Sequence, residues 1–306
     1  MSRKEFDQLF KEVCNWGRWG PEDEKGTLNY LTPAMVKKGA SMVKSGRTVS
    51  MSRPIETLAS PDNATPVVHR MTRLYQDARN EMEEPKFVSD HLSSELHGNA
   101  NSHVDALCHV SYRGRLYNDR PMDAVTTEGA KSMDISQYAR GIIGRGVRLD
   151  IPRLRKVKWL EPGETVTAEE LEEAEVAEGV RLGQGDVFAF RVGHSLRRLE
   201  LGAWDIDKVG RAGLDPRAMR LLHKRKVSAF LPDGDGEAIP SPVEGVRYPV
   251  HALQISAMGL ACGDSLQLED LSWACQKEKR WEFMVAMSPL VIPGATGSLV
   301  NPIAVF

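Results

Sequence analysis

The sequence predicts a mixed α/β fold in a single domain. Segments that read as strands and helices alternate through the second half of the chain, while the first half is irregular. The 306 residues contain no internal repeat, low-complexity tract or linker that would divide them. Hydrophobic residues make up 41% of the chain and charged residues 27%, which is the usual balance of a globular protein. We therefore expect one domain over 1–306, with residues 1–60 packing on it or on a partner subunit.

The elements expected in the first half depend on capping and turn signals. Residues 1–14 predict a short helix. Thr32-Pro33 predicts a second helix that runs to about Lys44, because a capping hydroxyl precedes a proline at the first helical position. Residues 48–53 alternate like a strand. The polar segment 61–96 has no clear period, and so long an irregular stretch is more often a functional loop than filler.

The elements expected in the second half are strands and helices in alternation. The expected strands are 146–151, 186–192, 227–231, 248–260, 281–286 and 299–306. The expected helices are 167–179, which opens with the capping box Thr167-Ala-Glu-Glu170, then 215–226 and 268–275.

Charge and cysteine usage exclude several kinds of protein. A formal net charge of −2 and a pI near 6.5 give no field that would attract nucleic acid or an anionic membrane. No apolar run approaches the roughly 20 residues that span a bilayer, and the charged N-terminus does not resemble a signal peptide. The scattered cysteines argue against a disulfide scaffold or a zinc knuckle: Cys14, Cys108, Cys262 and Cys275. We expect a cytoplasmic protein that acts on a small molecule, with no nucleic-acid or membrane partner.

The segment 97–109 carries the chemistry of the chain. It holds His97, His103 and His109, with Asp105 between the last two. On an extended segment, His103 and Asp105 would share one face, and His109 would lie one turn further on if the chain coils there. Imidazole and carboxylate together suit zinc, manganese or ferrous iron. The alternative is a structural role, in which buried histidines are only hydrogen-bonded core residues.

A known family has a similar motif. The run Ser102-His-Val-Asp-Ala-Leu-Cys-His109 resembles the metal-binding signature of the "cyclase" superfamily of metal-dependent hydrolases, which includes kynurenine formamidase, isatin hydrolase and trans-dienelactone hydrolase. The runs that begin at Trp16 and at Pro293 resemble the two ends of the long branch of this family. The resemblance implies a swivelling β/β/α-type domain with a distorted barrel-like sheet, assembled as a homodimer or homotetramer.

The motif departs from the family pattern at its first position. There the family has a metal-ligating histidine, whereas this chain has Asn99, and His97 lies two residues too early. Either the loop brings His97 to the metal, or Asn99 is a weak neutral ligand, or the site binds metal poorly. We favour His97, because Gly98 leaves the backbone free to reposition it.

The resemblance also implies residues further along the chain. His251 matches a late histidine of the pocket, and Asp264 matches an acidic site where kynurenine formamidase has Glu. A buried structural role for His251 and a turn or helix cap at Asp264 are the alternatives. Asp264 and Asn99 are both candidates for binding a second metal ion or for contacting the substrate.

The reaction implied is metal-assisted hydrolysis of a cyclic amide, lactone or N-acyl (formamide) bond. His97, His103 and Asp105 would hold zinc or manganese, and the ion would activate water and polarise the carbonyl. His109 would act as general base and then general acid, and His251 would orient the carbonyl or complete the coordination. The alternatives are a metal-independent cyclase, dehydratase or lyase on the same scaffold, and a binding protein without activity.

Overall fold

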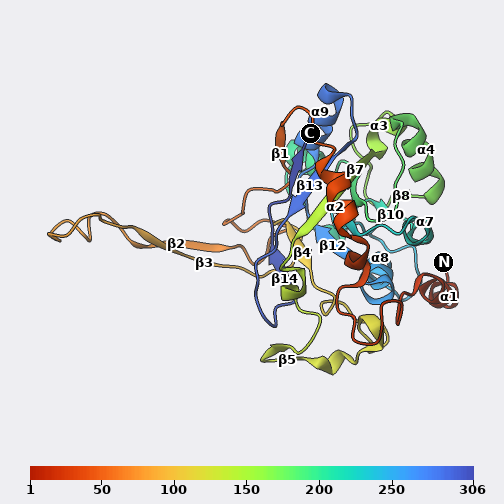
Figure 1. The fold of residues 1–306 in the computed structure, drawn as a ribbon, viewed down its shortest axis with the longest axis horizontal. Coiled ribbons are helices and arrows are strands. Elements are labelled where there is room, and N and C mark those ends of the chain that lie inside the picture. Colours follow the sequence, from red (N-terminus) through yellow and green to blue (C-terminus); the bar gives the residue numbers. More distant parts are fainter.

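A nine-stranded sheet forms the centre of the computed structural model, which describes residues 1–306 (Figure 1). In spatial order its strands are β1 (Thr48–Ser50), β15 (Ile303–Val305), β13 (Glu282–Met287), β7 (Ile142–Asp150), β9 (Val187–Arg191), β11 (Ala229–Pro232), β12 (Ala261–Asp264), β4 (His103–Asp105) and β14 (Gly297–Leu299). β7, β9, β11 and β12 run parallel, and the strands at either side of them pair antiparallel. The predicted mixed α/β class is confirmed.

The central strands are buried on both faces of the sheet. In β9, Phe188 and Phe190 belong to one hydrophobic cluster and Val187 and Ala189 to another, so the two sides of one strand serve separate cores. Parallel strands covered on both faces are typically continuous apolar runs, which is how this segment reads in the sequence.

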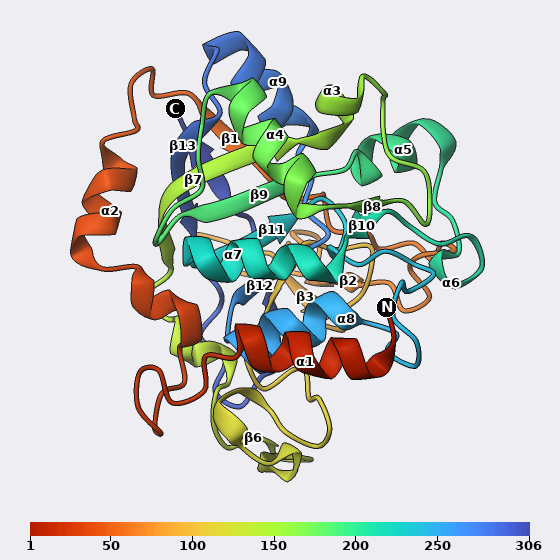
Figure 2. The same cartoon turned by 90° about the vertical axis from the view of Figure 1, so that its right-hand side faces the viewer.

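Several helices cover one face of the sheet (Figure 2). In chain order, the helices of the protein are α1 (Arg3–Val13), α2 (Pro33–Ala40), α3 (Ile151–Arg155), α4 (Ala168–Glu178), α5 (His194–Leu201), α6 (Ile206–Val209), α7 (Met219–Arg225), α8 (Pro249–His251) and α9 (Glu269–Glu278). The cluster on this face combines Phe6 of α1, Leu171 of α4 and Leu222 of α7 with the phenylalanines of β9. α9 packs on the other face, where its Leu271 and Cys275 join the cluster of Val187 and Ala189. None of the helices has the length and apolar character that a membrane crossing requires.

The capping signals correctly predicted where helices begin. Thr167 and Glu170 form the reciprocal capping box at the start of α4, and Thr32 caps α2 ahead of Pro33. The end of α2 was predicted less well, since the helix stops at Ala40 rather than near Lys44. The predicted helix 215–226 begins with a 3-10 turn before α7.

The strand predicted over 248–260 is wrong, because this segment is helical. Pro249 starts α8, which continues directly into a π-helical turn over Ala252–Met258. Gly259, with φ of 61°, ends the turn in the left-handed conformation that glycine adopts without strain. Every residue of the turn is buried, and a fully buried run has no polar face from which its period could be read.

The segment 61–96 contains a long two-stranded arm rather than only an irregular loop. β2 (Val68–Arg73) pairs antiparallel with β3 (Ser89–Ser93), and Figure 1 shows this ribbon projecting away from the body of the molecule. Almost every residue of both strands is exposed. No buried face imposes an alternating pattern, so the strands had no signal in the sequence. Two further short pairs are β5 (Val125–Thr126) with β6 (Gly129–Ala130), and β8 (Thr165–Val166) with β10 (Gly213–Leu214).

Candidate metal centre

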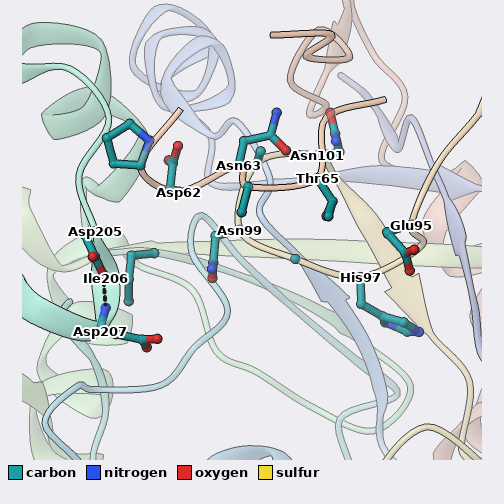
Figure 3. A pocket seen from close by; sticks show the side chains of 14 residues that line it. Asp62, Asn63, Thr65, Glu95, His97, Asn99, Asn101, Asp205, Ile206 and Asp207 are labelled. Carbon is teal, nitrogen blue, oxygen red and sulfur yellow. Dashed lines mark hydrogen bonds between the residues drawn. The ribbon is translucent and has the colours of Figure 1, made fainter. Parts of the chain in front are cut away.

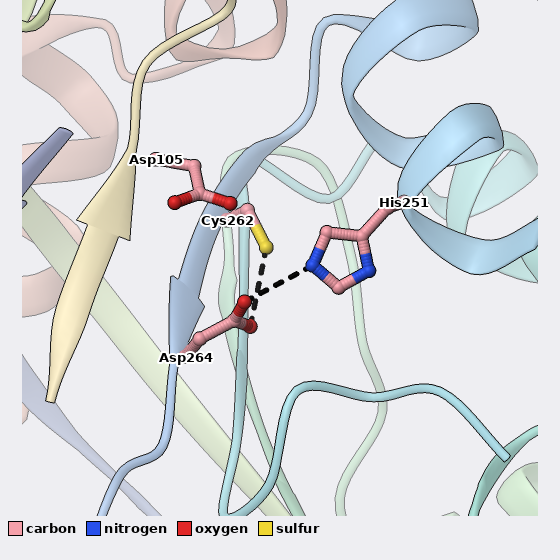
Figure 4. A group of neighbouring side chains, drawn as sticks. All are labelled: Asp105, His251, Cys262 and Asp264. Atoms are coloured by element: carbon pink, nitrogen blue, oxygen red, sulfur yellow. Dashed lines mark hydrogen bonds and ion pairs between the residues drawn. The ribbon is translucent and has the colours of Figure 1, made fainter. Parts of the chain in front are cut away.

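The centre of the candidate site is built on two neighbouring antiparallel strands. The register of β4 and β12 places Asp105 opposite Cys262 and His103 opposite Asp264. Because side chains alternate along a strand, these four residues point to the same face of the sheet. All four are buried, with exposed fractions of 3% or less. Figure 4 shows Asp105, Cys262 and Asp264 converging from the strands.

His251 reaches the same point from α8. Its Nε2 lies 3.0 Å from Oδ2 of Asp264 (Figure 4). Its Nδ1 lies 3.0 Å from Oε1 of Glu237. The same Glu237 oxygen accepts a hydrogen bond from the backbone N–H of His251. Glu237 therefore fixes the orientation of the ring and leaves Nε2 directed at the two strands. The histidine predicted from a supposed strand thus reaches the site from a helix.

His103 is oriented by its own loop. Its Nδ1 lies 2.9 Å from the carbonyl oxygen of Asn101, which can only accept a hydrogen bond, so Nδ1 is the donor. Nε2 is left facing the site, 3.6 Å from Oδ1 of Asp105 and 3.9 Å from Oδ2 of Asp264. A histidine held by its second nitrogen in this way has the arrangement of a metal ligand.

The preceding loop brings His97 to Asp105. Nδ1 of His97 lies 2.8 Å from Oδ1 of Asp105, and its Nε2 lies 2.9 Å from Oγ1 of Thr296. The ring stacks on that of His109, with centroids 3.5 Å apart and planes 5° from parallel. The ligand atoms of His97, His109 and Asp105 thus lie within 4.8 Å of one another, while His103 belongs to neither that group nor the one around Cys262, its Nε2 lying 3.6 Å from Oδ1 of Asp105.

Asn99 has a different environment. Its Oδ1 accepts a hydrogen bond of 2.7 Å from Nη1 of Arg211, and its backbone carbonyl accepts one from Arg53. Arg211 is itself buried and paired with Asp235. The amide oxygen that would be the neutral ligand is therefore bound to a guanidinium.

The donor set fits a divalent metal ion. Two groups of side chains have ligand atoms that all lie within 4.8 Å of one another: Asp105, His251, Cys262 and Asp264 form one, and His97, Asp105 and His109 the other. Asp105 belongs to both groups. Carboxylates, imidazoles and a thiol gathered around one point offer many lone pairs, and a cation is the partner that such a set accepts most readily.

The centre opens into a cavity of about 260 Å³. Its lining includes His97, His103, Asp105, His109, Arg211, Tyr248, His251 and Asp264. A neighbouring cavity of about 280 Å³ shares His97 and Asn99 with it and extends toward Asp62 and Asp207 (Figure 3). These dimensions suit a small molecule rather than a polymer.

Burial and mutual charge set the protonation of the site. Burial disfavours the ionised carboxylate of Asp105, but the hydrogen bond with His97 and the charges of His109 and His103 outweigh it and lower the pKa. Burial lowers the pKa of His109 to about 4. Burial would also lower the pKa of His251, yet the adjacent Asp264 carboxylate raises it well above its usual value. An ionised acid beside a neutral imidazole is the combination that metal binding and general-base catalysis use.

Four residues of the site were missed in the sequence: Cys262, Arg211, Glu237 and Thr296. Strand alternation ahead of Asp264 could have placed Cys262 on the ligand face. The other three come from loops that approach the centre only in the folded chain, and no local spacing marks them.

Comparison with solved structures shows which class of protein has this fold. A crystal structure described as a novel cyclase matches with a TM-score of 0.83 at 29% identity, over 96% of this chain and 100% of that one. Isatin hydrolase A from Ralstonia solanacearum matches with a TM-score of 0.56 at 21% identity, over 89% and 95% of the two chains. A predicted metal-dependent hydrolase from Bacillus stearothermophilus matches at 0.52 and 13% identity, over 85% and 98%. The fold is therefore that of a cyclase, and it is shared with hydrolases.

The sequence itself assigns the family. The family model described as "Putative cyclase" matches residues 48–235. The chain therefore belongs to the Cyclase family, which confirms the resemblance noted around His103 and Asp105. The matched span includes the segment 97–109 and ends before His251 and Asp264. No curated protein matches the chain in sequence.

Proposed function

We propose that this protein is a metal-dependent hydrolase that cleaves a cyclic amide, lactone or N-acyl bond in a small molecule. The observation that carries the proposal is the convergence of His103, Asp105, His251 and Asp264 beside a cavity of about 260 Å³. The shared fold with two proteins described as hydrolases supports the reaction class.

His97, His103 and Asp105 are the proposed ligands of a zinc or manganese ion. The 2.8 Å contact between His97 and Asp105 supports the choice of His97 over Asn99, whose oxygen is bound to Arg211. Asp264 and His251 lie on the other side of Asp105, where they would complete the coordination or contact the substrate. When bound, such an ion lowers the pKa of water and polarises a carbonyl group.

The chain's own residues supply the proton transfers. His109 lines the cavity, and its low pKa keeps the imidazole neutral, so it can take a proton from the attacking water. Water adds to the carbonyl carbon, the bond to nitrogen or oxygen breaks, and His109 returns the proton to the leaving group. His97 holds the His109 ring in place by stacking on it.

A metal-independent lyase or cyclase is the second candidate. It is favoured by the pairing of Asn99 with Arg211, which leaves one position of the family's ligand set without a metal-binding side chain.

We further propose that the protein forms a homodimer or homotetramer through the β2–β3 arm. The arm exposes large apolar side chains, among them Tyr75, Met82 and Phe87 with exposed fractions of 64%, 98% and 61%. An isolated two-stranded ribbon is marginally stable in water, so an arm of this kind needs a surface to pack against. A second copy of the chain is the proposed partner.

Metal analysis separates the two candidate functions. We expect protein purified without added metal to contain a stoichiometric ion, which is lost in His103→Ala and retained in the control His91→Ala on the exposed arm. A panel of aryl formamides, isatin-like lactams and unsaturated lactones should then show turnover that stops on chelation and returns with zinc or manganese. Full turnover of this panel by metal-free protein would refute the metal dependence, whereas a metal-free protein that turns over none of these substrates would favour the lyase or cyclase.

A further inference from the structure

Cys262 lies among the candidate metal ligands, a position that packing alone does not explain. It lies directly opposite Asp105 across the β4–β12 pair, and residues opposite one another on antiparallel strands have Cβ atoms roughly 5 Å apart. Asp264 follows two residues later on the same strand and so points to the same side. On this face of the sheet, Cys262 is therefore the neighbour of both Asp105 and Asp264.

Polar groups of the centre lie close to the thiol of Cys262. Sγ of Cys262 lies 3.3 Å from Oδ1 of Asp264, and its ligand atom lies within 4.8 Å of those of Asp105, His251 and Asp264 (Figure 4). The side chain is fully buried. A buried cysteine usually behaves as a small hydrophobic residue, and Cys262 does belong to a hydrophobic cluster. Its sulfur atom, however, also lies beside two carboxylates and an imidazole, which packing alone does not require.

The backbone holds Cys262 in this orientation. β12 is paired on both sides, with β11 along Ala261 and Cys262 and with β4 along Cys262 to Asp264. At Gly263 a Cβ atom would lie 2.6 Å from Cδ2 of Leu231, so the strand packs closely on its neighbour at the next residue. A strand fixed on both edges cannot rotate to turn the thiol away.

We propose that Cys262 joins the proposed ligands as a thiolate, on the side of Asp105 that Asp264 and His251 occupy, and thereby makes this centre selective for zinc over manganese and magnesium. Thiolate is a soft ligand that suits zinc and cobalt, whereas oxygen donors alone suit magnesium and manganese. The inference rests on the metal centre of the proposed function and adds both a ligand and a choice of ion.

Cobalt substitution tests the thiolate directly. Metal-free protein loaded with cobalt(II) should show a thiolate-to-cobalt charge-transfer band in the near ultraviolet in addition to its visible ligand-field bands. The charge-transfer band should disappear in Cys262→Ser and persist in Cys275→Ser, which removes an equally buried thiol from α9. Competition with a chelator should give a zinc affinity at least about 10- to 100-fold lower in Cys262→Ser, the loss that follows when even a supporting residue is removed. Manganese affinity should change little.

Zinc-edge X-ray absorption of the unmodified protein covers the case in which Cys262→Ser does not fold. A sulfur scatterer at about 2.3 Å is expected. Ligand-field bands without a charge-transfer band, or a zinc shell of nitrogen and oxygen only, would overturn the thiolate inference and leave the metal centre standing. Failure of the unmodified protein to bind either cobalt or zinc would refute the proposed metal-dependent function as well.

Discussion

At the scale of single residues, His97 and Asn99 define how this chain differs from the family pattern. His97 contacts Asp105, whereas Asn99, which stands at the family's ligand position, contacts Arg211 instead. The change is possible because Gly98 between them adopts φ of 136°, which other residues rarely adopt.

These two contacts predict that truncating His97 and truncating Asn99 will have unequal effects on metal affinity. His97→Ala should weaken zinc or manganese binding by about 10- to 100-fold, because it removes a group in direct contact with Asp105. Asn99→Ala should change the affinity less, because its oxygen already has a guanidinium partner. Isothermal titration of both variants measures the difference. A larger loss in Asn99→Ala would mean that the asparagine is the ligand.

The role and the low pKa of His109 predict how catalytic activity depends on this residue and on pH. His109→Gln should lower kcat by about 10²- to 10⁴-fold while the metal content stays unchanged, because the variant loses the base and keeps the proposed ligands. A general base works only when unprotonated, so activity is lost as the pH falls through its pKa. Because that pKa is lowered from 6.5 to about 4, kcat/KM should stay level through pH 6.5 and decline only toward pH 4. An acid limb centred near 6.5 would contradict this role.

Residue spacing alone could predict the site only where its residues are neighbours in sequence, whereas His251 and Asp264 were implied by the family resemblance. His103 and Asp105 share a face because strands alternate, and His97 and His109 lie close on either side. Cys262 joins them through the register of β12 on β4, and Arg211 through a loop that reaches Asn99. Such pairings depend on how the whole sheet assembles, and no spacing in the sequence encodes them.

At the scale of elements, the capped helices and the short buried strands β9 and β11 were predictable, whereas the long buried run 248–260 and the exposed arm were not. α4 has a capping box and a helix-ending glycine, and both ends lie where the sequence places them. The buried run 248–260 and the exposed strands of the arm have no contrast between two faces, so neither has a readable period.

The packing of α2 on β7 predicts an unusual effect of alanine. In most helices Gly→Ala stabilises by about 1 kcal/mol through helix propensity. At Gly39, however, a Cβ atom would lie 2.4 Å from the backbone carbonyl carbon of Gly144, and backbone cannot yield as a flexible side chain can. Gly39→Ala should therefore lower the free energy of unfolding by about 1–3 kcal/mol, as overpacked substitutions do. Denaturant titration measures it.

The matched control for this prediction is Lys37→Ala, which changes an exposed residue of the same helix. Its free energy of unfolding should stay within about 0.5 kcal/mol of the unmodified protein. If Gly39→Ala were as stable as the unmodified protein, α2 and β7 would have to lie further apart at Gly39 and Gly144 than they do in the structure.

At the scale of the whole molecule, the β2–β3 arm that we propose for subunit association is distinct from the nine-stranded sheet that forms the core of the fold. β2 and β3 pair with each other and project from the body, while the metal centre lies on the nine-stranded sheet (Figure 1). An element that packs on nothing in its own chain contributes little to the stability of that chain. Its removal should therefore affect association and leave the fold intact.

Arm removal can be designed from the strand register. Arg70 and His91 are paired, so replacing residues 71–90 with Asn-Gly should close the ribbon with a two-residue turn. We expect the unmodified protein to sediment as a dimer or tetramer and the shortened protein as a monomer, with the same thermal midpoint when both are compared at low concentration. As a milder variant, Met82→Ser with Phe87→Ser keeps the arm but removes two of its large exposed apolar side chains, and it should weaken association in the same direction. A shortened protein that still sediments as an oligomer would show that the subunits meet at another surface.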